Sequence, residues 1–186
     1  MEFVKEIVKK AKLVLTKPKI FFEGAKKEDG IKDAFIYYAV LSLVGTILQT
    51  LAAVVLQGGK GLNIPALVVV YILTLLLIFI VIAIIHVWAK IFGGTGTFVN
   101  TYQLYVYSNT PKPLLNFIPI IGPLAGSIYA LVIFVIGGTV MHKFSMKKSI
   151  LVFAVPAVII TLLSIILAFA FVALLPTFLM SAANQQ

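Results

Sequence analysis

The sequence predicts an all-α membrane protein, with about five transmembrane helices that follow a basic amphipathic helix at the N-terminus. Hydrophobic residues make up 61% of the 186 residues, and charged residues only 11%. The mean hydropathy is +1.12, and a soluble domain of this size needs more polar surface than such a composition supplies. The apolar residues also form runs of about 20 residues, the length that crosses ~30 Å of hydrocarbon as a helix.

The charges are unevenly distributed, because all six acidic residues and nine of the fifteen lysines lie in residues 1–33. The other lysines lie near the ends of apolar runs, and no basic stripe with interleaved aromatic residues is present. This pattern favours anionic lipid headgroups as the partner and argues against nucleic acid. The chain contains no cysteine, which excludes disulfides, thiolate catalysis and sulfur-ligated metals.

Residues 1–33 form a predicted cytoplasmic head that lies at the membrane surface. Its first half has apolar residues on one helical arc of roughly 140°: Phe3, Val4, Ile7, Val8, Ala11, Val14 and Leu15. Four lysines project from the remaining arc and are the candidate lipid-surface residues: Lys5, Lys9, Lys10 and Lys12. A basic amphipathic helix of this kind is typical of the headgroup plane, and packing against the protein's own spans is the alternative.

Residues 34–180 form the predicted membrane domain, and residues 181–186 a short polar tail. The predicted spans are Ala34–Leu56, Pro65–Ala89, Phe98–Ile121, Pro123–Met141 and Ser149–Phe178. The third is interrupted by prolines and amides, so it is either a broken span or a re-entrant hairpin. We expect a kink or an unwound turn near Thr110–Leu114, covered by neighbouring helices.

The distribution of lysines favours five complete spans with a cytoplasmic N-terminus and an outer C-terminus, in a multi-pass protein of the cell membrane. In that topology thirteen lysines lie on the cytoplasmic side, and two, Lys60 and Lys112, on the outer side. If the third run did not cross, Lys143, Lys147 and Lys148 would move outside, against the positive-inside rule.

Three ionisable residues within or beside the spans are candidates for function, because such groups are costly in a membrane. His86 and His142 lie near the cytoplasmic ends of their spans and could approach each other, but two histidines without a carboxylate or thiol make a poor metal site. Lys112 either anchors the outer interface or lines a polar cavity with Asn109 and Asn116.

No catalytic motif is present, and the sequence predicts neither an enzyme nor a cofactor. There is no nucleophile elbow, no zinc-protease motif, and no acid after Asp33 to orient a histidine. Small residues indicate helix packing instead. The candidate packing positions are Gly45, Gln49, Gly122, Gly126, Gly137 and Gly138. Packing within the bundle and self-association are both open for these residues.

Several short motifs, in their order and spacing, resemble the Yip family of Ypt-interacting five-span membrane proteins. They are Pro18 with Phe21 and Phe22, then Gly93, Gly94, Gly96 and Phe98, then Tyr105 to Ser108 followed by Pro111. The resemblance covers residues 13–175 and is to a short prokaryotic, archaeal-type form. It implies five helices, a cytoplasmic N-terminus, homo- or hetero-oligomers and, in eukaryotic members, vesicle trafficking and membrane shaping with Rab-type GTPases.

This chain lacks the long cytoplasmic domain and the acidic motif of the eukaryotic members, so the resemblance implies membrane organisation, and a small GTPase partner is left open. The leading hypothesis is therefore a non-catalytic membrane-organising scaffold. The alternative is a passive channel, or a transporter of lipids or small solutes, that uses the broken third span as its pathway.

Overall fold

The computed structural model describes residues 2–57 and 63–183, which are helical with no strand among them. Within these residues, four segments are long and apolar enough to cross a membrane. They are α3 (Lys32–Gln57), α4 (Ile64–Ile91), α7 (Ile121–Met141) and the C-terminal segment that ends in α9 (Val155–Ala183). The predicted all-α membrane fold is confirmed. Lys60 and residues 184–186 of the predicted tail lie outside the described residues, and residues 181–183 continue α9.

Local sequence explains where α4 begins and ends. The side chain of Asn63 accepts a hydrogen bond from the backbone N–H of Ala66 at 3.0 Å, and Pro65 occupies the first turn, where its missing N–H costs nothing. Gly93, just beyond the helix, adopts a φ of +74°, which a glycine tolerates. The glycine turn predicted after the second span therefore ends this helix.

The third predicted run is broken into α5 (Phe98–Ser108) and α6 (Pro111–Leu115). Pro111 has no N–H to donate to the carbonyl of Tyr107, four residues earlier. The hydroxyl of Thr110 donates to that carbonyl at 2.6 Å instead, and Asn109 Nδ2 donates to the carbonyl of Tyr105 at 2.7 Å. The break thus lies at Asn109–Thr110, at the start of the predicted interval, and Thr110 and Pro111 are buried as expected.

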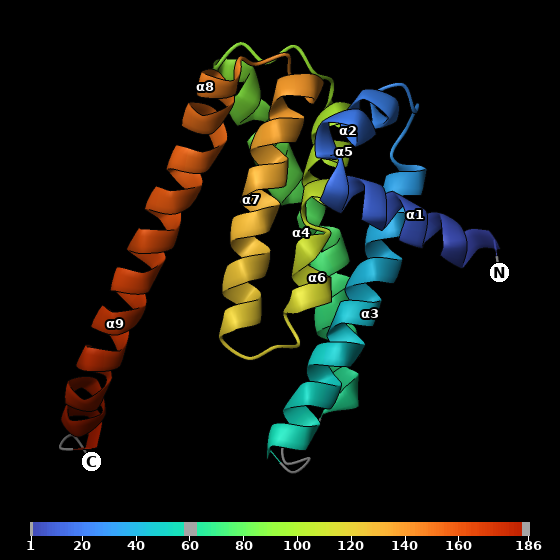
Figure 1. The fold of residues 1–186 in the computed structure, drawn as a ribbon. Helices are drawn as coiled ribbons and strands as arrows, with labels where there is room; N and C mark the ends of the chain where they lie inside the picture. The colour runs from blue at the N-terminus through green and yellow to red at the C-terminus, as the bar shows by residue number, and fades with distance from the viewer. Residues whose placement is uncertain (1, 58–62, 184–186) are drawn as a thin grey trace.

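The α5–α6 segment runs antiparallel to α7, and residues 116–120 join the two (Figure 1). The backbone N–H of Thr95, just after α4, donates to the carbonyl of His142 at 3.2 Å, so α4 and α7 end at a similar level. However, α4 has 28 residues and α7 only 21. At about 1.5 Å per residue, the α6–α7 hairpin turns about 10 Å short of the far end of α4.

The head packs on the membrane domain through α2 (Pro18–Ala25), whereas α1 (Glu2–Thr16) contacts α2 and α5 and points away from the bundle at its N-terminal end (Figure 1). Phe22 is fully buried against Gly137 of α7. Lys26 Nζ donates to the carbonyl of Val140 at 2.6 Å, in the last turn of α7, where a cation complements the helix dipole. Partial burial, and then the charge of Lys143, lower the pKa of Lys26.

The C-terminal segment contains a feature that the sequence analysis did not predict, a π-helical turn at Ile150–Ala154 between α8 (Met146–Ser149) and α9. Pro156 follows it and cannot donate to the carbonyl of Val152. Trp88 Nε1, from α4, donates to that carbonyl at 2.8 Å. Beyond this contact, α9 diverges from α7 (Figure 1).

The predicted small-residue positions mostly serve packing within the chain. A Cβ atom on Gly45 would lie 2.4 Å from Pro113 of α6, and one on Gly122 or Gly126 would meet Leu115 or Lys112 of the same helix. Gly137 faces Leu104 and Phe22, and Gly138 faces Ser149 and Phe153. Gln49, in contrast, is exposed on α3.

Candidate functional site

The arm formed by α1 is only partly packed against the bundle. Ala11 and Val14 are buried, whereas Phe3, Val4 and Val8 are 52%, 61% and 59% exposed. The C-terminal half of the apolar arc therefore packs on the protein. The apolar side chains of the N-terminal half remain exposed and are available to contact lipid or another protein.

The four candidate lipid-surface lysines do not behave alike. Lys5, Lys9 and Lys12 are exposed. Lys10 turns toward the protein, where its Nζ atom lies 3.6 Å from Glu6 and 3.6 Å from Glu28. The pair with Glu28 ties α1 to the turn before α3, so Lys10 positions the arm, and three lysines remain free to face a membrane surface.

The residues of the motifs gather where the head meets α5 and α7. The ring of Phe21 packs edge-on against Tyr107, with ring centroids 4.7 Å apart, and Phe22 contacts Gly137. Pro18 starts α2, and Pro111 starts α6. Phe98 begins α5 and packs edge-on against His86, with centroids 5.8 Å apart.

His86 and His142 come together at the end of the bundle that holds the head, as their positions suggested. Their ring centroids are 6.4 Å apart, and Thr101 of α5 lies between them. The Thr101 hydroxyl is 2.7 Å from His86 Nδ1 and 3.2 Å from His142 Nε2. It also donates to the carbonyl of Thr97 at 3.2 Å, which leaves its lone pairs for the imidazole N–H groups.

The glycine-rich turn after α4 fits closely around His142. A Cβ atom on Gly94 would lie 2.7 Å from His142 Nδ1, and one on Gly96 would lie 2.9 Å from the same atom. Phe144 stacks on the imidazole with ring centroids 5.6 Å apart. The turn therefore has glycines where the ring needs space, which makes it a packing element and not a phosphate-binding loop.

The histidine cluster has the properties of a structural hydrogen-bond network. Burial, and secondarily the nearby His86, lower the pKa of His142, which keeps its ring neutral. Within residues 2–57 and 63–183, no three histidine, aspartate or glutamate side chains come together in a way that could hold a metal ion. Sequence reasoning missed Thr101, although its hydroxyl, four residues after the cap Thr97, was a signal for a buried polar contact.

A groove of about 650 Å³ opens between α4, α5, α7 and α9. Its walls are mainly aliphatic and aromatic, with Asn109 and Lys112 among the few polar groups. Of the predicted polar cavity, Asn116 does not line this groove, because it lies toward Gly126 on the packed side of α6. Tyr105, which belongs to one of the sequence motifs, also lines the groove, as do Ser127 and Thr161, two polar residues that the sequence did not point to.

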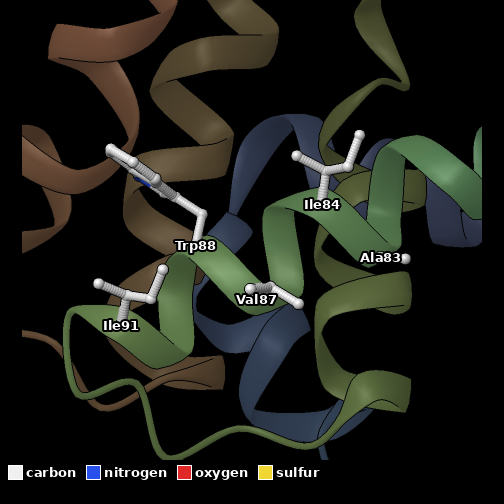
Figure 2. Close-up of a pocket in the computed structure, with 5 residues that line it drawn as sticks. All are labelled: Ala83, Ile84, Val87, Trp88 and Ile91. Carbon is white, nitrogen blue, oxygen red and sulfur yellow. The ribbon is translucent and has the colours of Figure 1, made fainter.

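A second, shallow hollow lies on the outer surface of α4, lined by Ala83, Ile84, Val87, Trp88 and Ile91. All five side chains are apolar or aromatic. Figure 2 shows the indole of Trp88 directed toward the C-terminal helices and away from Val87. Trp88 therefore lies at the boundary between this lipid-facing surface and the groove, which it also lines.

The other polar residues of the third run serve the fold. Thr97 caps α5, and Asn100 completes the capping box, because each side chain accepts a hydrogen bond from the backbone N–H of the other residue. Gln103 is buried, and its Nε2 donates to the carbonyl of Glu28 at 3.2 Å. A transport pathway through the third run would use its polar side chains, Asn100, Gln103, Asn109, Lys112 and Asn116. Of these, only Asn109 and Lys112 lie at the groove.

The family model described as the Yip1 domain matches residues 12–169, which include the arm's C-terminal part, the glycine turn and the broken third run. No curated protein and no solved structure matches the chain.

Proposed function

Because this chain belongs to the Yip1 domain family, we propose that it is a non-catalytic scaffold that organises the membrane in which its helices lie. The arm carries this proposal, because it leaves Phe3, Val4 and Val8 exposed beside free lysines. Apolar side chains that enter one leaflet, with lysines at the anionic headgroups, would hold the protein to that leaflet and expand it.

The third run supports the same function. Asn100 and the amide nitrogen of Gln103 are hydrogen-bonded within the protein, which a scaffold requires and a hydrated pathway does not. The proposed partners are anionic lipids and a second copy or another membrane protein, because α9 exposes apolar residues on all sides between Val158 and Phe171. The alternative, a transporter, is favoured by one observation, the presence of Asn109 and Lys112 at the groove.

The first test measures insertion of the arm in the whole protein. Val4→Cys, the only cysteine in such a variant, carries a polarity-sensitive fluorophore in vesicles that contain anionic lipid. We expect a blue-shifted emission that Lys5→Gln, Lys9→Gln and Lys12→Gln together reverse. Each lysine contributes about 1 kcal/mol near a charged surface, so the triple variant should weaken insertion on the order of 100-fold.

The control replaces Lys19, Lys27 and Lys32, which are also exposed but lie off the arm, by glutamine. This variant loses the same charge and should keep the blue shift. If both triple variants behave alike, or if insertion is insensitive to salt, the arm does not act through its own lysines.

A second experiment separates the scaffold from the transporter. Purified protein in anionic liposomes should narrow or tubulate them, as seen by electron microscopy, and leave the flux of small solutes and of labelled lipid at background. The arm variant should lose the shape change. Flux from the wild-type protein that Lys112→Gln abolishes would establish the transporter instead.

We also propose the topology with a cytoplasmic N-terminus and an outer C-terminus. Because the chain has no cysteine, a cysteine at exposed Ser145, which follows α7, can be labelled selectively from either side. We expect a membrane-impermeant thiol reagent to label Ser145→Cys only after the membrane is opened. Labelling of intact cells at this position would reverse the orientation.

A further inference from the structure

We propose that the groove between α7 and α9 is a binding site for an anionic phospholipid, with Lys112 at the headgroup and one acyl chain along the groove. This site lies apart from the arm and does not depend on the scaffold function. Three observations support it: an uncompensated cation, the apolar walls, and the length of the groove.

The first observation is the charge of Lys112. Its side chain is half-buried at the groove, and the structure gives it neither an ion pair nor a hydrogen bond within the described part of the chain. All six acidic residues lie in the head, residues 1–33, which packs at the other end of α7. A lysine inside a membrane protein is costly without a counter-charge. The membrane itself supplies one, the phosphate of an anionic lipid.

The second observation is the chemistry of the walls. From Leu124 to Phe134 on α7, and from Val152 in the π-helical turn to Leu162 on α9, the groove is lined mainly by aliphatic and aromatic side chains. The volume of about 650 Å³ lies within the range of about 300–1,000 Å³ that holds small ligands. Such a surface suits a hydrocarbon chain and does not suit a solute that carries its own water.

The third observation is the direction and length of the groove. The backbone of Lys112 lies next to Gly126, in the first turns of α7, and Trp88 lies at the other end, hydrogen-bonded to Val152. Ten residues of helix between these ends rise about 15 Å. That is half of the ~30 Å hydrocarbon thickness, the depth of one leaflet. A lipid whose phosphate meets Lys112 would thus direct its chain toward Trp88.

The test uses Trp88, the only tryptophan in the chain, as an internal probe. The whole protein is placed in zwitterionic nanodiscs that contain rising fractions of phosphatidylglycerol or phosphatidylcholine, each brominated on one acyl chain. Bromine quenches nearby indole fluorescence. We expect phosphatidylglycerol to quench Trp88 at an about fivefold lower lipid fraction than phosphatidylcholine, because one contact between a lysine and an anionic lipid contributes about that factor in affinity. The Lys112→Gln substitution should remove this preference.

Controls distinguish the groove from other lipid contacts. Lys147→Gln removes one exposed cation elsewhere in the chain and should leave the preference unchanged, as should the arm variant. Ala130→Trp, made together with Trp88→Phe, moves the probe into the middle of the groove and should report the same preference. Circular dichroism of each variant establishes that it is folded.

Three outcomes would overturn the proposal. Equal quenching by both lipids in the wild-type protein would remove the headgroup preference. A preference that survives Lys112→Gln would place the anionic lipid at another lysine. If a brominated fatty acid, and not brominated phosphatidylglycerol, quenches Trp88 in a way that depends on Lys112, the ligand of the groove is a free carboxylate and not a phospholipid. Loss of liposome shaping in the arm variant, with this preference intact, would separate the two proposals.

Discussion

Replacing Gly45 by alanine should lower the free energy of unfolding by about 1–3 kcal/mol, the usual cost of forcing extra volume into a packed site. The added Cβ atom would lie 2.4 Å from Pro113 Cβ, 2.7 Å from Pro113 Cα and 2.9 Å from the Pro113 carbonyl oxygen. Two of these are backbone atoms, and the ring of Pro113 cannot rotate away. The contact between α3 and α6 must therefore open, which would also displace Lys112, a residue of α6.

A thermal unfolding scan of the purified protein in detergent measures this change. Gly24→Ala is the matched control, because Gly24 lies in α2 and a Cβ atom there would meet nothing within 4 Å. That substitution should be neutral or slightly stabilising, since alanine restricts the unfolded chain. Equal melting temperatures for Gly45→Ala and wild type would show that α6 does not pack against α3 as described.

Replacing Thr101 by valine should cost about 1–3 kcal/mol, because the buried imidazole of His142 loses its hydrogen-bond partner. Valine has nearly the same shape, so the packing around α5 is kept while the hydroxyl disappears. That hydroxyl is within hydrogen-bonding distance of both His86 and His142. His142 is fully buried, and the Thr101 hydroxyl faces its Nε2 atom; the other ring nitrogen, Nδ1, has no hydrogen-bond partner within the described structure.

The same unfolding scan measures the effect, and Thr74→Val is its control, because Thr74 is exposed on α4 and bonds only within its own helix, to the carbonyl of Val70. Thr101→Ser, which keeps the hydroxyl, should recover most of the lost stability. If serine, which keeps the hydroxyl, destabilises the protein as much as valine does, the hydrogen bonds of Thr101 do not account for the effect.

The spans could be predicted from the sequence because hydrophobic length is a local property. The predicted second span, Pro65–Ala89, corresponds to α4, Ile64–Ile91, and the predicted fourth, Pro123–Met141, to α7, Ile121–Met141. The break in the third run followed from prolines whose carbonyl partners can be counted along the chain. In each case the residues that determine the span or the break lie within a few positions of it in the sequence.

The candidate site was less predictable, because its contacts join residues far apart in the sequence. Helical periodicity placed Lys10 with the free lysines, but Glu28, which draws it inward, lies in a turn whose position depends on how α2 packs. The bond from Trp88 to Val152 joins α4 to the π-helical turn, and no local pattern contains both partners. The groove likewise exists only because α9 diverges from α7.

The short hairpin of α6 and α7 gives the protein two unequal hydrophobic lengths. On one side α4 presents 28 residues, about 42 Å of helix, and on the other α7 presents 21 residues, about 31 Å. A bilayer responds to such a mismatch by thinning beside the shorter face or by letting the longer helix tilt. The surrounding lipid should therefore be deformed asymmetrically, and the protein should partition between membranes according to their thickness.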